Sequence, residues 1–460
     1  MSDPGRWLRR GLALCALALT ACGEDAGGEA APVAPPAASP GAAAEVAPAE
    51  APSAAADAEP ATRTDSFNTG PRRWTPATVA TLQPVPPTRS VFTPAPLASN
   101  PRYDKTLATL RDAVTKHAGD PDNPWAIGHG LLAMGPDFVL SNSQPAVDWI
   151  FSQYAEELPL GDAAGDYRAV VFPRSRGEQR IEPHAGLMLK ALTEIGVAPD
   201  KAVTVQGQPH TVADLYRGVL MSSYLVPERN HASFESPNDV PWALQGLATW
   251  APPDTPLLWR TPDGTDMALS DLTAFSASVL IQESQGLFRA MEAGAEFEKR
   301  GQGIFKYTCG GSHLLQGTAY SVARGNGTEV ARSGMTGQAA LMFYRLPVEL
   351  LIYDRLMERA PQHMLLLLVQ RLKFLGHYLE TQHRLAALGF YAPTAKQKEL
   401  LEGAATQLVL LVEAMEERAI FDAMDALRTE QEQVYLDLIG DSAHAINGLE
   451  IALGRRPIRY

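Results

Sequence analysis

The stretch His184-Ala-Gly-Leu-Met-Leu-Lys-Ala-Leu-Thr-Glu-Ile-Gly196 contains the pattern that decides the fold of this 460-residue chain. A histidine comes first, small and apolar residues follow, and a glycine closes the stretch. The same pattern recurs at intervals of 55 to 71 residues and is led by His129, His184, Trp242, His313, His377 and His444, here called the lead residues. A repeat of this length indicates an architecture built from similar helical units.

Glycine stands four positions after three of the lead residues, as Gly246, Gly317 and Gly448. Residues four apart lie on one face of a helix, and glycine on that face lets a second helix approach closely. We therefore expect the lead segments to form helices that pack tightly against one another.

Twelve helices are predicted in two alternating sets. The lead segments predict inner helices near residues 125–135, 184–196, 241–250, 309–324, 362–388 and 430–454. Amphipathic spacing between them predicts outer helices, longer and more charged, near residues 102–118, 144–158, 211–225, 270–299, 336–357 and 396–427. Pro347 is expected to kink its helix or to mark its end.

A second repeat has nearly the same period. The stretches 203–215 and 259–272 each combine a short β-hairpin around a glycine with the start of a helix. Their aspartates, Asp214 and Asp271, are 57 residues apart. Two independent features with nearly one period support a true repeat.

Six pairs of inner and outer helices resemble the (α/α)6 toroid of terpenoid cyclases, protein prenyltransferase β-subunits, lanthionine cyclases and several glycan-active enzymes. The resemblance lies in periodicity over residues 97–460, because the Asp-x-Asp-Asp and Gln-x-x-Asp-Gly-x-Trp motifs are missing. It implies an all-α toroid with short β-hairpin insertions, in one domain. An open α-solenoid is the alternative.

The first 22 residues have the anatomy of a secretory signal peptide. A basic stretch at residues 6–10 precedes an apolar run over residues 11–19, which is too short to span a bilayer. The following Leu19-Thr-Ala-Cys22 resembles the lipobox of bacterial lipoproteins, which implies cleavage before Cys22 and lipid on its thiol. Gly23 at the next position resembles the signal for outer-membrane sorting.

Residues 23–96 are predicted to be a disordered tether. From Gly23 to Thr62, 28 of 40 residues are Ala, Pro or Gly, a composition that cannot bury enough apolar surface to fold. The tether would hold the body away from the membrane. Signal and tether together predict a lipid-anchored protein of the cell envelope, at the outer membrane.

Composition narrows the classes of function. Hydrophobic residues make up 45% and charged residues 20% of the chain, as in a folded globular protein. The formal net charge is −13 without a basic patch, so nucleic acid is not an expected partner. Of three cysteines, Cys15 leaves with the signal and Cys22 carries lipid, so Cys309 is the one thiol of the body.

In a ring of helices the lead residues would lie at the N-terminal ends of the inner helices and converge on one cavity. His129 and Trp242 are then candidate binding residues for a small molecule or a glycan. His231, in the polar stretch 228–235, is a third candidate, because a loop there could cover the cavity mouth. An ordinary solvated connection is the alternative interpretation of that stretch.

Cys309-Gly-Gly-Ser-His313 is the densest chemical feature. A thiol and an imidazole four residues apart can share a helix face and ligate one zinc ion, with His184 or His129 from a neighbouring helix. Protein prenyltransferases bind zinc through one Asp, one Cys and one His, and the resemblance to them implies Asp239 as a carboxylate ligand. A Cys–His nucleophilic pair is a second hypothesis. A buried structural cysteine beside a hydrogen-bonded histidine is the third.

Carboxylates precede two lead residues at matching places in successive repeats. Glu182 stands before His184, and Asp239 stands before Trp242. With His184, these two acids are candidate catalytic residues for acid–base chemistry on a sugar or a similar substrate. Helix capping explains Asp239 equally well, whereas Glu182 is a poorer cap.

Two functions from different classes fit these features. The first is a metal-assisted or acid–base enzyme acting on an envelope or extracellular molecule, which the polar lead residues and Cys309 suggest. The second is a non-catalytic binding or scaffold lipoprotein, which would use the rim or the acidic outer face.

Overall fold

The computed structural model describes residues 83–158, 168–223, 225–226, 231–232, 237–252, 256–260, 266–299 and 303–460. The signal peptide, Cys22 and the tether up to residue 82 lie outside the described residues, as does the side chain of His231. The described chain is predominantly α-helical, and its strands have two to four residues. The prediction of an all-α fold is confirmed at this level.

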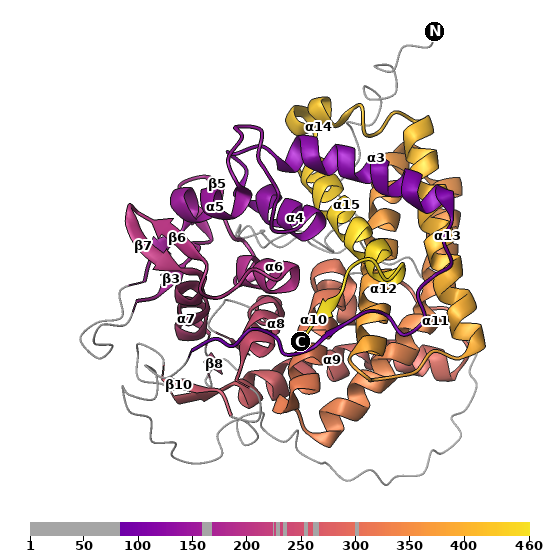
Figure 1. Ribbon diagram of the computed structural model, residues 1–460. Coiled ribbons are helices and arrows are strands. Elements are labelled where there is room, and N and C mark those ends of the chain that lie inside the picture. The colour runs from indigo at the N-terminus through magenta and orange to yellow at the C-terminus, as the bar shows by residue number, and fades with distance from the viewer. Residues whose placement is uncertain are drawn as a thin grey trace, which may run out of the picture.

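Six helices coincide with the lead segments and lie at the centre of Figure 1. They are α4 (Pro124–Met134), α6 (Leu187–Ile195), α8 (Val240–Trp250), α10 (Ser312–Ser321), α12 (Met364–Ala387) and α15 (Glu432–Ala452). Their bounds lie within three residues of the predicted ones. Among the described residues, no helix combines the length and apolar character needed to cross a bilayer.

Helices of the second set surround the central ones in Figure 1. They are α3 (Pro101–Ala118), α5 (Ala146–Tyr154), α7 (Val212–Ser222), α9 (Leu269–Glu292), α11 (Glu329–Arg359), α13 (Ala395–Glu417) and the short α14 (Met424–Glu430). One prediction here was wrong: the helix expected over 396–427 is broken near Ala419, whose φ is 53°. Helix α11 runs through Pro347, so this proline does not mark the end of its helix, and the helix packs on α9 and α12.

The strands form six two-stranded antiparallel pairs in the described chain. Their bounds are β1 (Ser90–Val91) with β12 (Ile458–Arg459), β2 (Glu156–Glu157) with β3 (Val170–Val171), β4 (Ser175–Arg176) with β5 (Gln179–Arg180), β6 (Ala202–Val205) with β7 (Gln208–Thr211), β8 (Leu225–Val226) with β9 (His231–Ala232), and β10 (Leu258–Arg260) with β11 (Asp266–Ala268). Both predicted hairpins are confirmed as β6–β7 and β10–β11. Each is followed at once by a helix, and Thr211 and Asp214 form a capping box for α7.

The central helices pack in chain order, each on the next, and α15 also packs on α4 and α3. The glycines after the lead residues allow this packing. A Cβ at Gly317 would lie 2.2 Å from the Pro241 carbonyl oxygen of α8, and one at Gly448 would lie 2.6 Å from the Gly376 carbonyl oxygen of α12. The expected close approach at these two glycines is confirmed.

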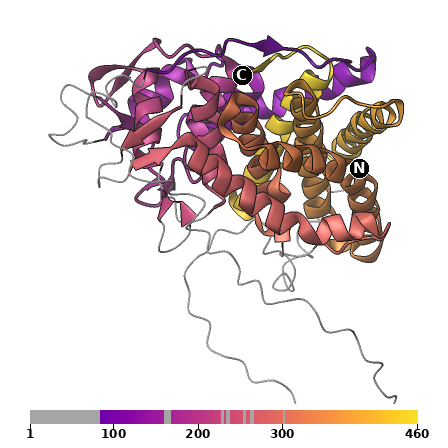
Figure 2. The same ribbon diagram turned by 90° about the horizontal axis from the view of Figure 1, so that it is seen from below.

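One end of the central helices is covered by two segments from opposite ends of the described chain. The strap, residues 83–97, crosses this end, and the C-terminal tail, residues 454–460, pairs with it through β1 and β12 (Figures 1 and 2). Hydrogen bonds from these two segments reach last-turn carbonyl oxygens of five central helices, including Arg456 to Ala133 of α4 (2.6 Å), Arg459 to Glu194 of α6 (2.6 Å), Val85 to Trp250 of α8 (2.9 Å), Tyr460 to Ala387 of α12 (3.3 Å) and Leu97 to Ala452 of α15 (2.9 Å). We call this the closed end.

Candidate functional site

All six lead residues line one cavity of about 760 Å³ at the other end of the central helices, the open end. Its wall comes from the first turns of α4 and α15, the loops before α6, α8 and α10, and one face of α12. The lead residues were expected to lie at the N-terminal ends of their helices, and not all of them do. Trp242 and His313 do, but His377 and His444 lie about halfway along α12 and α15, because these helices start several turns earlier.

The rings of the lead residues touch in a continuous series. The Trp242 ring lies between two imidazoles, with centroids 4.8 Å from His184 and 3.7 Å from His313. His313 lies 4.7 Å from His377, which lies 4.0 Å from His444. Residues far apart in the sequence are thus brought together by the repeat.

Hydrogen bonds fix the tautomers of several of these histidines. His129 Nδ1 lies 2.9 Å from the Trp125 carbonyl oxygen, and His444 Nδ1 lies 3.0 Å from a carboxylate oxygen of Glu380. A neutral imidazole that donates from Nδ1 presents a lone pair at Nε2. Neither nitrogen of His313 has a hydrogen-bond partner among the described residues. The cluster therefore presents several nitrogen lone pairs and few donors.

Burial keeps these imidazoles uncharged. It lowers the pKa of His129 to about 4, against the opposing hydrogen bond to Trp125. Burial, and then the neighbouring His377 and His444, hold the pKa of His313 well below its ordinary value. Near neutral pH the histidines are thus in the form that ligates metals.

The described residues bring Cys309, His313 and His377 together as one possible metal-binding group. The Sγ atom and one nitrogen of each imidazole all lie within 4.8 Å of one another. The structure thus groups His377 with the predicted Cys309–His313 pair. His184 instead stacks on the far side of Trp242, and Asp239 pairs with Arg174.

The loop that carries Cys309 has an unusual backbone. Cys309 has φ 54° and ψ 37°, and the next two residues, Gly310 and Gly311, also have positive φ. Left-handed backbone is uncommon outside glycine, and such outliers gather at functional sites. The Arg345 guanidinium, held by Glu349, donates to the Gly310 carbonyl oxygen at 3.2 Å. The thiol is therefore presented on a supported, strained turn.

Glu380 lies beside one histidine of the metal-binding group, His377, and beside the neighbouring His444. One of its oxygens lies 3.0 Å from His444 Nδ1 and 3.5 Å from His377 Nδ1. Its other oxygen accepts from Arg384 at 2.9 Å. Burial alone would raise the pKa of Glu380, but Arg384 and His444 hold it well below its ordinary value. His377, Glu380 and His444 also lie close enough to hold a metal, but the Glu380 oxygens are already engaged.

A buried ionic network, the floor network, separates the cavity from the closed end. Lys190 pairs with Glu194 at 2.7 Å, Glu194 with Arg384 at 2.5 Å, and Arg384 with Glu380 at 2.9 Å. Two cations and two anions balance within it, so burial leaves no uncompensated charge. Sequence reasoning missed this network. Two sequence features could have revealed it: Lys190 lies inside an apolar lead segment, and Glu380 and Arg384 are four residues apart.

The two predicted catalytic acids lie outside the cavity lining. Glu182 is buried and accepts a hydrogen bond from the Met188 backbone N–H at 2.8 Å, so it satisfies the first turn of α6. Burial raises the pKa of Glu182 to about 8. Asp239 pairs with Arg174 at 2.5 Å and makes no side-chain cap of α8. Asp441, which the sequence did not single out, is the buried acid of the lining.

No protein-family model matches the chain, and no curated protein and no solved structure matches it at a significant level. The cavity and its histidine cluster are therefore interpreted from their own geometry. That geometry combines nitrogen lone pairs, a thiol and an accessible hollow.

Proposed function

We propose that this chain is a zinc-dependent enzyme of the cell envelope, whose cavity takes a small molecule or a glycan. Cys309, His313 and His377 would hold the ion. Cysteine and histidine are the ligand types that zinc prefers, and three protein ligands with an open fourth position are typical of catalytic zinc. At such a position the ion lowers the pKa of a water molecule and supplies a nucleophile.

The main support for this proposal is that buried imidazole nitrogens converge on one point without hydrogen-bond donors to pair with. His313 and His377 each have both imidazole nitrogens without a hydrogen-bond partner in the described part of the chain. Buried polar atoms are almost always hydrogen-bonded, so a cluster of exceptions calls for an explanation. A metal ion at this point would satisfy the nitrogens and the Cys309 thiolate together.

The carboxylate of Glu380, next to His377, strengthens the case for a metal ion. Ligating histidines commonly direct their second nitrogen to a carboxylate, which fixes the ring and raises its basicity. Glu380 stands in that position behind His377, 3.5 Å from Nδ1. Its own hydrogen bonds to Arg384 and Asn447 hold it in place.

We infer that the central and surrounding helices form a closed α/α toroid rather than an open solenoid. The packing of α15 on α4 supports closure, because an open solenoid would leave its first and last units apart. The signal-like N-terminus with Cys22 supports a lipid anchor in the outer membrane. Replacing Cys22 by alanine should move the protein from the membrane fraction to the soluble fraction, and unchanged fractionation would remove the anchor.

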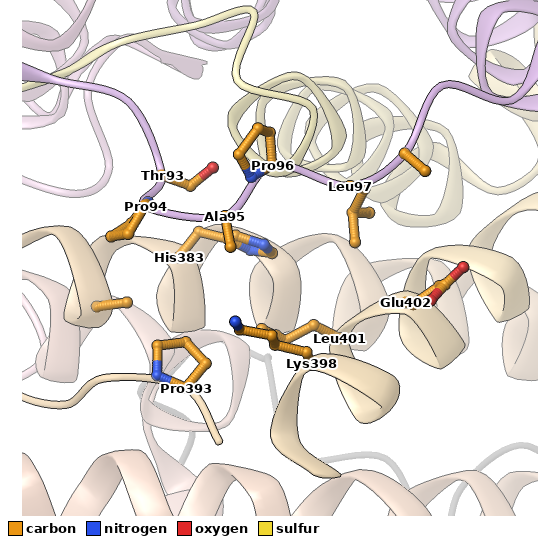
Figure 3. A pocket seen from close by; sticks show the side chains of 12 residues that line it. Thr93, Pro94, Ala95, Pro96, Leu97, His383, Pro393, Lys398, Leu401 and Glu402 are labelled. Carbon is orange, nitrogen blue, oxygen red and sulfur yellow. The ribbon is translucent and has the colours of Figure 1, made fainter. Parts of the chain in front are cut away.

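The test of the zinc site compares two histidines on one helix. His377→Ala removes a proposed ligand. His383→Ala is the matched control, because His383 is 3% exposed, has its Nδ1 on the Leu379 carbonyl oxygen at 2.8 Å, and has Nε2 unpartnered among the described residues. His383 lies against a separate small cavity of about 140 Å³ beneath the strap, as Figure 3 shows.

The measurement is zinc content and zinc affinity of the purified full-length lipoprotein in detergent. We expect one zinc per chain in the wild type and in His383→Ala. Loss of a ligand should weaken binding by more than about 100-fold in His377→Ala, since second-shell changes alone cost 10–100-fold. A wild type without stoichiometric zinc, or equal affinity of the two variants, would overturn the proposal in favour of a scaffold or a metal-free site.

A further inference from the structure

Asp441 on α15 is a second reactive group in the cavity. It is 3% exposed and belongs to the lining, and its Oδ2 has no hydrogen-bond partner among the described residues. The other acidic residues of the lining are more open to solvent: Asp122, Glu178 and Glu432 are exposed, and Asp437 is half-buried. Asp441 is thus the lining acid that combines burial with access to the hollow.

Asp441 shares its counter-ion, Lys373, with a second carboxylate. Lys373 of α12 lies 3.9 Å from Asp441 Oδ2, but it lies nearer to Asp437, at 3.2 Å. Asp437, one turn earlier on α15, repels a second negative charge. His377 of α12 and His444 of α15 also line the cavity, and burial lowers the pKa of each, so neither supplies a cation near neutral pH.

Burial therefore dominates the chemistry of this carboxyl. It raises the pKa of Asp441 well above its ordinary value, Lys373 opposes this shift, and Asp437 adds to it. A carboxylic acid kept neutral in an apolar or desolvated site can donate a proton or a hydrogen bond at neutral pH.

We propose that Asp441 is the proton donor of this cavity, serving a hydrolysed ester, amide or glycoside that has an oxygen or nitrogen leaving group. This inference rests on the proposed function, because the zinc site supplies the water. Asp441 precedes His444 by one helical turn, so it lies on the same face of α15 as the histidine cluster.

The proposed hydrolysis neither gains nor loses a proton overall. Water bonds through its oxygen to the electrophilic carbon, and the bond from that carbon to the leaving oxygen or nitrogen breaks. Asp441 gives its proton to the leaving atom and becomes a carboxylate beside Lys373. The proton that the water loses returns to Asp441. General acid catalysis of this kind typically contributes about 10²- to 10⁴-fold in rate.

The experiment asks whether Asp441 is protonated and reachable from the cavity. A hydrophobic carbodiimide adds to a protonated carboxyl to give a stable N-acylurea, which peptide mass mapping locates. Metal-free full-length protein is treated with dicyclohexylcarbodiimide between pH 6 and pH 9. We expect adduct on Asp441, lost in Asp441→Asn, with a rate that falls about tenfold per pH unit once the carboxyl ionises.

Glu182 supplies the internal control. Its pKa is also raised, to about 8, but it lies outside the lining. We expect weaker labelling there, because access and not protonation alone controls the reaction. No adduct on Asp441, or an adduct no stronger than that on Glu182, would overturn the inference.

Zinc affinity separates this inference from the proposed function. Asp441→Asn should bind zinc as the wild type does, because Asp441 is not a proposed ligand. Labelling of Asp441 in a protein that binds no zinc would leave a proton donor and remove the zinc enzyme. Zinc binding without labelling of Asp441 would support the zinc enzyme and remove the proton donor.

Discussion

The two ends of the central helices are built from the same repeat but satisfy their polar groups in opposite ways. At the closed end, last-turn carbonyl oxygens accept hydrogen bonds from the strap and the C-terminal tail. At the open end, His313, His377 and Asp441 retain atoms without partners in the described chain. Helix ends need partners for their free backbone groups, and the closed end supplies them.

This contrast separates stability from function. Arginines near helix C-termini also complement the negative end of the helix dipole, so the closed end is arranged for stability. Buried unpaired groups cost stability, and a ligand at the open end would satisfy them.

Acid should lower the free energy of unfolding, mainly through the buried histidines of the open end. Burial lowers the pKa of His129 to about 4, whereas an unfolded chain has histidines near 6.5. Between these pH values the unfolded state binds a proton that the folded state does not, so stability falls as the pH falls. Each such histidine removes about 1.4 kcal/mol per pH unit below 6.5.

Several histidines add to this effect, and two carboxyl groups oppose it. The pKa values of His313, His377, His383 and His444 are lowered, whereas those of Glu182 and Asp441 are raised. We expect a net loss of several kcal/mol between pH 6.5 and pH 4.5 in urea unfolding. His129→Asn should show a shallower slope. Constant or rising stability on acidification would contradict the prediction.

Arg456→Ala should damage the closed end most, with a smaller effect through Asn447, which accepts from Arg456 at 3.0 Å and donates to Glu380. Its guanidinium donates to the Ala133 carbonyl oxygen and pairs with buried Glu450, so its loss should cost about 2–4 kcal/mol of unfolding free energy. Arg455→Ala is the control, because Arg455 pairs with exposed Asp104 and such pairs are worth about 1 kcal/mol or less. A change in zinc affinity in Arg456→Ala would mean that the two ends are coupled.

Glu380→Gln should damage the open end most. Loss of the carboxylate charge would weaken the hydrogen bond from His444 Nδ1 and the contact with His377 at 3.5 Å, so zinc affinity should fall 10–100-fold, or about 1.4–2.7 kcal/mol. Glu194→Gln in the same floor network is the control, since the structure shows no hydrogen bond from Glu194 to a described imidazole. Isothermal titration with zinc measures both. Equal affinities would remove the orienting role of Glu380.

The repeat made much of the fold predictable. Helix bounds followed from the lead segments, and both hairpins followed from glycine turns before an Asp. The lead residues were identified because one period places equivalent positions on equivalent helix faces. The break near Ala419 was not predictable, since tertiary packing decides whether a local signal ends a helix.

The sequence predicted which residues line the site better than it predicted which of them contact one another. Periodicity indicates which residues face a common centre, yet it does not indicate side-chain direction. His184 and His377 were equivalent in the pattern, but only His377 approaches Cys309 and His313. Glu182 was singled out as a poor cap, although its carboxylate reaches the Met188 backbone N–H from six residues away. Asp441 carries no local sequence signal, because its burial arises only from packing.

The pairing of β1 with β12 has a mechanical consequence. Arg89 and Tyr460 exchange two backbone hydrogen bonds of 3.0 Å, which clasp the strap to the C-terminal tail. A pulling force that enters through the strap is carried first by this clasp and by the Val85–Trp250 bond. The histidine cluster lies at the far end of the same helices, so such a load can be borne without distorting the cavity.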